Sequence, residues 1–270
     1  MHTVYVKDVL PQGCFGLGSG QDGRERIFSF GRAGSCLDLA WDLLDQGGLQ
    51  TWDSVLCESQ SGGRGRMRRV WHSPPGNIYA AWLWPDPKPG WENLISLAAG
   101  YALCRGLFRL GAGVRIKWPN DLWGRGGKAG GISVEQRRGR CMVGAGINLH
   151  SPPDETGLRA NALGKAFCLG PELPKWSISG LWACLVYQGR NWYEQKIAAS
   201  DPVDVVPEFE EVMAFKGEYV CLQTDTQKIC GRLMGLTDKG EICIYTSKGM
   251  RSLASGTLVE VRSVSPDPAD

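Results

Sequence analysis

One short segment gathers an unusual number of arginines. Between Glu58 and Tyr79, four arginines fall within six residues and are interleaved with glycines. They are Arg64, Arg66, Arg68 and Arg69. A guanidinium fork binds phosphate or carboxylate oxygens in pairs, and glycine lets backbone N–H groups approach the same anion. The segment therefore indicates an oxyanion-binding loop, and a solvated basic loop is the competing interpretation of this window alone.

A second segment, residues 115–135, combines a carboxylate, an amide and a lysine. Asn120 and Asp121 follow an apolar strand that Pro119 ends, and ligands often bind at such a strand end. Lys128 comes seven residues after Asp121 and just before two glycines, so it could reach an anion as a compact point charge. Trp71 and Trp118 could offer flat surfaces to a planar ring. Together the two segments predict a site for an anionic, ring-bearing ligand.

Alternating helices and strands must position these residues. Ser35 is a good N-cap for a helix that ends at Gly47, and a second apolar stripe predicts a helix over residues 91–110. A third helix is expected over residues 177–196. The predicted strands cover residues 54–58, 77–84, 114–118, 131–136 and 141–149. Residues 1–27 show only loose alternation and a glycine-rich stretch.

The chain changes character near residue 212. Pro202 and Pro207 bracket a stretch that is typical of a linker, and short strands at regular spacing follow it. These strands cover residues 219–223, 229–236, 241–246 and 258–261. We therefore predict a mixed α/β (α+β) domain over residues 1–212 and a small β-barrel over residues 213–270.

Composition excludes several classes of protein. The 270 residues include 30 basic and 28 acidic side chains, and a net charge of +2 does not suggest a dedicated nucleic-acid binder. The sequence has no apolar run long enough for a membrane span and no secretory signal pattern, so we expect a cytoplasmic protein. The ten cysteines are scattered without a CxxC pair, which argues against zinc and predicts small buried side chains.

The motifs, in their order and spacing, resemble those of the biotin protein ligases over roughly residues 30–262. The matching stretches are a GRGR loop at 63–66, W-x-S-P-x-G at 71–76, KWPND at 117–121, K-x-x-G at 128–131 and G-x-G-I-N at 144–148. The resemblance implies a class II synthetase-like catalytic fold with a central mixed sheet and a C-terminal Src-homology-3-like barrel.

The same resemblance implies a two-step activity. ATP and biotin would form biotinyl-5′-AMP, and the biotinyl group would then pass to one lysine of a biotin carboxyl carrier protein. Magnesium is the expected ion, with Asp121 as its ligand or as the group that orients the incoming lysine; zinc, DNA and membranes are not expected. A homodimer is left open.

Site residues carry over position by position. The resemblance implies catalytic roles for Lys128, Arg66 and Asp121. It implies a biotin site made of Ser35, Gln60, Gly63, Arg64, Lys128 and Gly131. It implies a nucleotide site made of Arg66, Arg69, Trp71, Asn120 and Asn148.

The sequence departs from the family pattern in three places. Cys36 and Leu37 stand where the family has Thr and Asn, Arg68 replaces a loop glycine, and only about 30 residues precede the first helix. We therefore expect weaker biotin binding and no winged-helix DNA-binding domain. The alternatives are a lipoate or octanoate ligase of the same superfamily, a non-catalytic biotin-binding relative, and a nucleic-acid-binding module based on the arginine loop.

Overall fold

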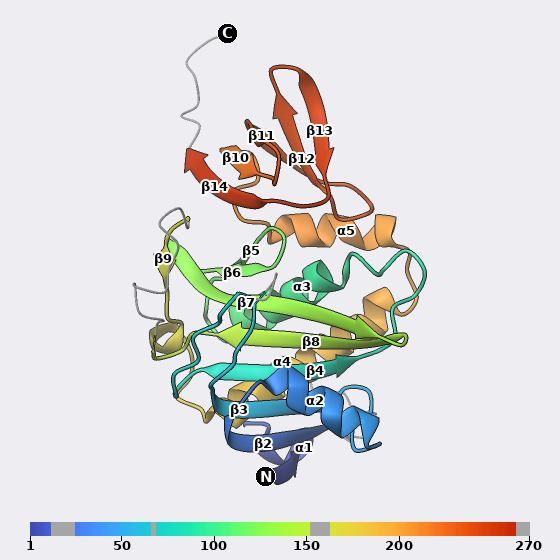
Figure 1. Cartoon of the computed structure of the whole chain (residues 1–270), viewed down its shortest axis with the longest axis vertical. Coiled ribbons are helices and arrows are strands. Elements are labelled where there is room, and N and C mark those ends of the chain that lie inside the picture. Colours follow the sequence, from blue (N-terminus) through green and yellow to red (C-terminus); the bar gives the residue numbers. More distant parts are fainter. Residues whose placement is uncertain (12–24, 66–68, 152–162, 263–270) are drawn as a thin grey trace.

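The computed structural model describes residues 1–11, 25–65, 69–151 and 163–262. These residues build a nine-stranded sheet and, above it in Figure 1, a five-stranded sheet made by the C-terminal strands. Helices cover the larger sheet on both faces. No helix in the described ranges is long and apolar enough to cross a membrane.

The larger sheet is mixed, as the sequence predicted. Its order is β1-β2-β3-β4-β8-β7-β6-β5, with β9 attached to β7. The pairs β2/β3 and β7/β9 are parallel, and the other neighbours are antiparallel. The strands are β1 (His2–Tyr5), β2 (Arg26–Ala33), β3 (Ser54–Gln60), β4 (Ile78–Trp84), β5 (Arg115–Lys117), β6 (Asp121–Trp123), β7 (Gly127–Arg137), β8 (Arg140–Ile147) and β9 (Lys165–Ala166).

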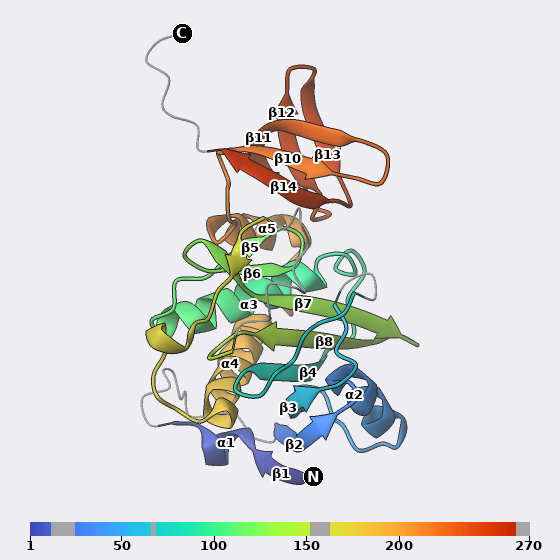
Figure 2. The same cartoon turned by 60° about the vertical axis from the view of Figure 1, so that its left-hand side comes forward.

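The two faces of this sheet carry different helices. Helix α2 (Cys36–Asp45) packs on β3, β4 and β8, whereas α3 (Ile95–Arg109) and α4 (Ile178–Trp192) lie together on the opposite face (Figures 1 and 2). The remaining helical segments are α1 (Val6–Val9), η3 (Gly170–Glu172), the π-helical turn η4 (Tyr193–Ile197) and α5 (Pro202–Glu211).

Strand β4 explains why both faces need a cover. All of its seven side chains are buried, so neither face of this strand can meet water. Successive side chains point to opposite faces. Ile78, Ala80, Trp82 and Trp84 join the core under α3 and α4, and Tyr79, Ala81 and Leu83 join the core under α2.

The C-terminal sheet is antiparallel throughout, in the order β13-β12-β11-β10-β14. Its strands are β10 (Tyr219–Gln223), β11 (Lys228–Leu236), β12 (Ile242–Thr246), β13 (Gly249–Leu253) and β14 (Thr257–Arg262). Alternate side chains of β11 are buried. The short, regularly spaced strands of this sheet are those from which the sequence predicted a small barrel, and we call this sheet the barrel.

The interpretation of the cysteines was right for some and wrong for others. Cys36, Cys57, Cys104 and Cys141 are free and buried, as predicted. Cys221 and Cys230, however, form a disulfide between β10 and β11, and Cys184 is also disulfide-bonded. The spacing of the two cysteines in the sequence did not predict the Cys221–Cys230 disulfide, because only the strand register places Cys221 directly opposite Cys230.

The stretch between Pro202 and Pro207 is helix α5 and not a linker. Pro202 lies in the first turn, where a missing N–H costs nothing, and Val205, Val206 and Phe209 are buried on one face of the helix. The free energy gained by burying this face outweighs the loss of the one backbone hydrogen bond that Pro207 cannot donate. The sequence reading also missed strands β2, β6 and β13.

Backbone hydrogen bonds join the C-terminal part of the chain to the larger sheet. Ile116 N donates to Val212 O at 2.7 Å, and Ala214 N donates to Ile116 O at 2.8 Å. Farther along, the indole of Trp118 donates to Gly240 O at 3.0 Å. The division at residue 212, which stays a prediction, would therefore cut through a paired segment.

Candidate active site

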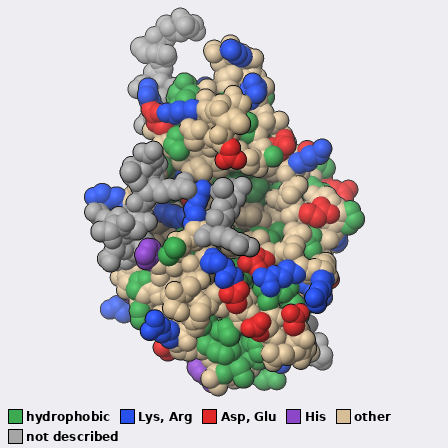
Figure 3. Space-filling model, in the orientation of Figure 1, with side chains coloured by type: hydrophobic (Ala, Val, Ile, Leu, Met, Phe, Trp, Pro, Cys, Tyr) green, Lys and Arg blue, Asp and Glu red, His purple; other side chains and the backbone are tan. Residues whose placement is uncertain are grey.

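A cavity of about 930 Å³ lies between the larger sheet and the barrel. Figure 3 shows the molecule hollowed between these two parts, with Lys and Arg side chains beside the hollow. Ten of the residues that the sequence singled out line this cavity. They are Ser35, Gln60, Arg64, Arg69, Trp71, Asn120, Asp121, Lys128, Gly131 and Asn148. Arg66 lies outside the described residues.

The strongest electrostatic feature of the cavity is a carboxylate held between two lysines. Asp121 Oδ1 lies 2.5 Å from Lys128 Nζ, and Asp121 Oδ2 lies 3.0 Å from Lys117 Nζ. Burial by itself would raise the pKa of Asp121, but attraction by Lys128 and Lys117 outweighs it and holds that pKa below its usual range. Asp121 is therefore ionised at neutral pH, and the cluster carries one net positive charge.

Strand pairing builds this cluster. Residues 115–123 form a tight hairpin in which Lys117 faces Asp121, and β6 then pairs with β7 so that Trp123 faces Lys128. The side chain of Lys117 is only 7% exposed, so it needs the carboxylate as a partner. Sequence reasoning gave Lys117 no role of its own. The i,i+4 spacing across a hairpin was the signal that could have placed it beside Asp121.

The residues around Asp121 do not fit a magnesium site. Mg²⁺ prefers several oxygen ligands, whereas both oxygens of Asp121 already face ammonium groups. Within the described ranges, no group of three or more His, Cys, Asp or Glu side chains gathers where it could hold a metal. We therefore infer that Asp121 pairs with Lys117 and Lys128 and does not bind magnesium.

Gln60 closes one end of the cavity by joining three elements. Its Oε1 accepts a hydrogen bond from Cys36 N at 2.8 Å, and its Nε2 donates to Ser73 Oγ at 2.9 Å. Ser35 is the buried N-cap of α2, and its hydroxyl accepts from Asp38 N at 3.5 Å. A polar group of a ligand would therefore meet an amide and a hydroxyl whose orientations are already fixed.

Cys36 and Leu37 make the adjoining wall apolar. Burial raises the pKa of Cys36 well above its usual range, so the thiol stays neutral, and its Sγ donates to Tyr79 O at 3.0 Å. The side chain of Leu37 packs over Gly144 of β8, where an added Cβ would lie 3.0 Å from it. Both residues line the cavity, at the positions where the sequence departs from the family pattern.

The indole of Trp71 lies on the glycine-rich floor. A Cβ at Gly146 would lie 2.7 Å from the Trp71 ring, and one at Gly131 would lie 3.4 Å from it. The ammonium of Lys128 lies 5.2 Å from the centre of the ring. Gly63 is required nearby, because a Cβ there would lie 2.5 Å from Trp71 O. Only glycines allow the flat ring to approach β7 and β8 this closely.

Two asparagines are fixed to the strand ends beside this floor. Asn120 Nδ2 donates to Ile132 O at 2.7 Å. Asn148 N donates to Ala129 O at 2.8 Å, and its side chain donates to Lys128 O at 3.3 Å. The turn after Asn148 is held by Asn77, whose Oδ1 accepts from three successive backbone N–H groups.

The barrel supplies a wall that sequence reasoning did not foresee. Gln223, Asp225 and the stretch 255–257 line the cavity from the barrel side. Lys165 and Ala166 of β9 line it from the other side. Trp118, expected to offer a stacking surface, is 2% exposed and is bonded to Gly240. No local pattern marks the barrel residues, because they reach the site only through the packing of the two sheets.

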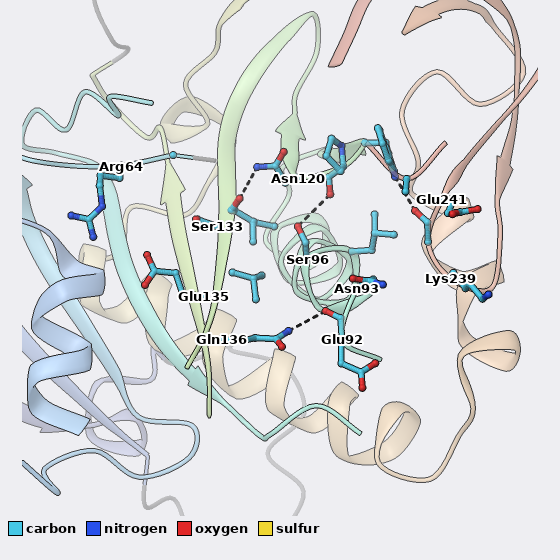
Figure 4. Close-up of a pocket in the computed structure, with 18 of the residues that line it drawn as sticks. Arg64, Glu92, Asn93, Ser96, Asn120, Ser133, Glu135, Gln136, Lys239 and Glu241 are labelled. Atoms are coloured by element: carbon cyan, nitrogen blue, oxygen red, sulfur yellow. Dashed lines mark hydrogen bonds between the residues drawn. The ribbon is translucent and has the colours of Figure 1, made fainter. Parts of the chain in front are cut away.

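A second cavity of about 1190 Å³ adjoins the first and shares Arg64, Asn120 and Ser133 with it. It lies between β7, the start of α3 and the barrel turn that carries Lys239 and Glu241 (Figure 4). Polar and apolar side chains both line it, and Gln136 donates to Glu92 O at 3.1 Å beside it.

Comparison with known proteins agrees with this geometry. Residues 33–151 match the family model described as the biotin/lipoate A/B protein ligase family. The matched stretch contains α2, the Lys117–Asp121–Lys128 cluster and the end of β8, and most of the residues that line the cavity lie in it.

Relatives with curated names match parts of the chain. The chain is 40% identical over 116 residues to the bifunctional ligase/repressor BirA of Escherichia coli, covering 40% of this chain and 36% of that protein. It is 28% identical over 220 residues to BirA of Bacillus subtilis, covering 76% of this chain and 65% of that protein. The chain thus spans about a third to two thirds of the length of these relatives.

Solved structures share the fold beyond residues 33–151. The biotin protein ligase from Aquifex aeolicus, solved in complex with biotin and ATP, superposes with a TM-score of 0.70 at 24% identity. The superposition covers 88% of this chain and 99% of that one. The expected fold class, a mixed-sheet ligase fold with a further C-terminal β unit, is confirmed.

Proposed function

We propose that the chain is an ATP-dependent biotin protein ligase that forms biotinyl-5′-AMP and transfers the biotinyl group to a lysine of a biotin carboxyl carrier domain. The observation that carries the proposal is the Lys117–Asp121–Lys128 cluster in the cavity. Joining a carboxylate to a phosphate brings two anions together, so the protein must neutralise and align them rather than supply a nucleophile.

In the first step, a carboxylate oxygen of biotin attacks the α-phosphorus of ATP, and the bond from that phosphorus to the pyrophosphate oxygen breaks. We assign Lys128 to the two approaching anions. Its side chain lines the cavity and is 33% exposed, and its ammonium lies 2.5 Å from Asp121. Lys117 is buried behind the carboxylate and keeps Asp121 ionised.

In the second step, the amine of the acceptor lysine attacks the acyl carbonyl carbon, an amide forms, AMP leaves and the amine loses its proton. Because Lys128 and Lys117 lower the pKa of Asp121, its carboxylate is a poor acceptor for the proton that the attacking amine loses. The accepting base is therefore not assigned to Asp121.

The remaining residues are proposed to bind the two small substrates. The biotin site comprises Ser35, Gln60, Gly63, Arg64, Lys128 and Gly131. The nucleotide site comprises Arg66, Arg69, Trp71, Asn120 and Asn148. The support is that all of the described ones except Gly63 line one cavity, and that Gly63 contacts Gln60 and Trp71 at its edge. A homodimer and a cytoplasmic location stay predictions, which sedimentation and cell fractionation would test.

The decisive experiment incubates the protein with α-labelled ATP, magnesium and biotin, and separates the products by chromatography. We expect labelled biotinyl-5′-AMP, followed by labelled AMP and a biotinylated carrier once a carrier domain is added. Parallel reactions with lipoate and octanoate should give no acyl-adenylate. Adenylate from lipoate alone would replace the proposal with the related ligase activity, and no adenylate from any acid would indicate a binding protein.

A further inference from the structure

Residues 63–65 pair with residues 69–71 beside the cavity, and we call these two paired stretches the hairpin. Trp71 N donates to Gly63 O at 2.8 Å, Gly65 N donates to Arg69 O at 2.8 Å, and Arg64 pairs with Val70 across the hairpin. The hairpin carries Trp71 onto the cavity floor, so the position of the ring depends on where the hairpin is held.

The hairpin is attached to the start of helix α2. Gly62 N donates to Gly34 O at 2.8 Å just before it. Beyond that point, Arg64 binds Asp38 in a two-pronged ion pair: Nη1 lies 2.8 Å from Oδ2, and Nη2 lies 2.5 Å from Oδ1. Figure 4 shows the guanidinium of Arg64 pointing toward this helix and away from Asn120. Both terminal nitrogens of Arg64 are thus engaged by the protein itself.

Charges on strand β7 support the same contact. Glu135 accepts from the indole of Trp41 at 2.8 Å and from Arg137 at 2.7 Å, and Arg137 lies 4.6 Å from the centre of the Trp41 ring. Trp41 follows Asp38 by one turn on the same helix, so α2 is tied to the hairpin and to β7 by neighbouring side chains. Ion pairs that form part of such a network contribute more than isolated surface pairs.

We infer that Asp38 is a positioning residue for the proposed ligase reaction: through the Arg64 guanidinium it fixes the hairpin over the cavity. The guanidinium of Arg64 then has a structural role and links the hairpin to α2, while the hairpin backbone and Trp71 face the ligands. The inference deepens the proposed function and refines the role of Arg64, whose side chain would not itself bind the biotin carboxylate.

The test compares Asp38→Asn, which keeps the shape and removes the charge, with Asp38→Glu, which keeps the charge. Asp42→Asn is the matched control, because Asp42 is an exposed acid one turn further along α2. We expect Asp38→Asn to raise the KM for biotin about fivefold with little change in kcat, and Asp38→Glu to restore most of the loss. Asp42→Asn should match the wild type.

Two further readouts separate positioning from general destabilisation. Added salt should raise the KM for biotin of the wild type but not of Asp38→Asn, because the ion pair is partly exposed and salt screens it. Hydrogen exchange at the Gly65 and Trp71 amides should be faster in Asp38→Asn without any ligand, since these amides close the hairpin.

The possible results are distinct. A lower KM for biotin in Asp38→Asn would mean that Asp38 competes with the substrate for Arg64, which overturns the inference. Unchanged KM and unchanged amide exchange would overturn it as well. If the wild type makes no adenylate, the proposed function fails, and the exchange measurement alone then decides whether Asp38 holds the hairpin.

Discussion

At the scale of single residues, the site depends on how one carboxylate is shared. Asp121 meets Lys128 on one oxygen and Lys117 on the other, and both lysines line the cavity. Lys128 is the more exposed of the two, and it is held in place by a carboxylate that the buried Lys117 helps to keep charged. Replacement of Lys128 and replacement of Asp121 should therefore have different effects, the first on the reaction rate and the second on stability.

Replacement of Lys128 by Met should slow adenylate formation about a hundredfold or more. Removing a charge-assisted contact to the reacting phosphate costs about 3 kcal/mol, and the side-chain volume is nearly conserved. Pyrophosphate release measures the effect. Lys248→Met, at an exposed lysine in the turn between β12 and β13, is the control and should be as active as the wild type. Similar activity of both variants would remove Lys128 from the reaction.

Replacement of Asp121 by Asn should lower the free energy of unfolding by about 3 kcal/mol at pH 7, because it leaves a buried lysine unpaired. The pKa of Asp121 is lower in the folded protein than in the unfolded chain. Its contribution is therefore present above pH of about 3.9 and is lost as pH falls through the lower folded value. Urea titrations of both proteins from pH 7 to pH 3 should show the difference shrinking only in the acid range. A difference that disappears between pH 7 and pH 5 would contradict this assignment.

At the scale of elements, the glycines of β7 and β8 make the floor on which Trp71 lies. A Cβ at Gly146 would come within 2.7 Å of the indole, and neither strand backbone can move away, because both are paired within the sheet. The floor therefore sets where the ring lies, and through the ring it influences the nucleotide site.

Gly146→Ala should consequently raise the KM for ATP about tenfold by displacing the Trp71 ring, while the protein stays folded. Steady-state kinetics with varied ATP test this. Gly113→Ala is the matched control, since nothing lies within 4 Å of a Cβ at Gly113. An unaltered KM for ATP in Gly146→Ala would mean that the ring is not part of the nucleotide site.

Elements also show where prediction from the sequence succeeded and failed. Apolar periodicity predicted α2, α3, α4 and the core strands, because each has a buried face with a regular repeat. It failed at α5, where two prolines suggested a linker although Val205 and Phe209 form a buried stripe. The motif order predicted ten of the residues that line the cavity. The ion pair of Asp38 with Arg64 depends on two elements meeting in space, which no local pattern encodes.

At the scale of the whole molecule, the larger sheet with its helices and the barrel share one hydrophobic core. Buried side chains of the barrel, such as Val220 and Leu233, belong to the same apolar cluster as those of α3 and α4. Trp118 bonds to Gly240, and Leu236 N donates to Glu210 Oε1 at 2.7 Å. The cavity that lies between the two sheets is formed only when both are in place.

We therefore expect the intact chain to unfold in a single calorimetric transition, and a fragment ending at residue 212 to lose cooperative unfolding and adenylate formation. That fragment lacks Ala214, the donor to Ile116, together with the barrel wall of the cavity. Scanning calorimetry of both chains is the measurement. Two well-separated transitions in the intact chain, or a cooperative, active fragment, would show that the boundary predicted at residue 212 divides two independent domains.

The pairing of Ile116 with Val212 and Ala214 also has a consequence for biosynthesis. During translation the N-terminal part of the chain leaves the ribosome first and can begin to fold. Strand β5 cannot complete its backbone hydrogen bonds at that stage, because Val212 and Ala214 are synthesised much later. The hairpin that brings Lys117 to Asp121 starts from this strand. The Asp121 carboxylate should therefore reach its final place only near the end of synthesis, and incomplete chains released before then would lack the Lys117–Asp121–Lys128 cluster.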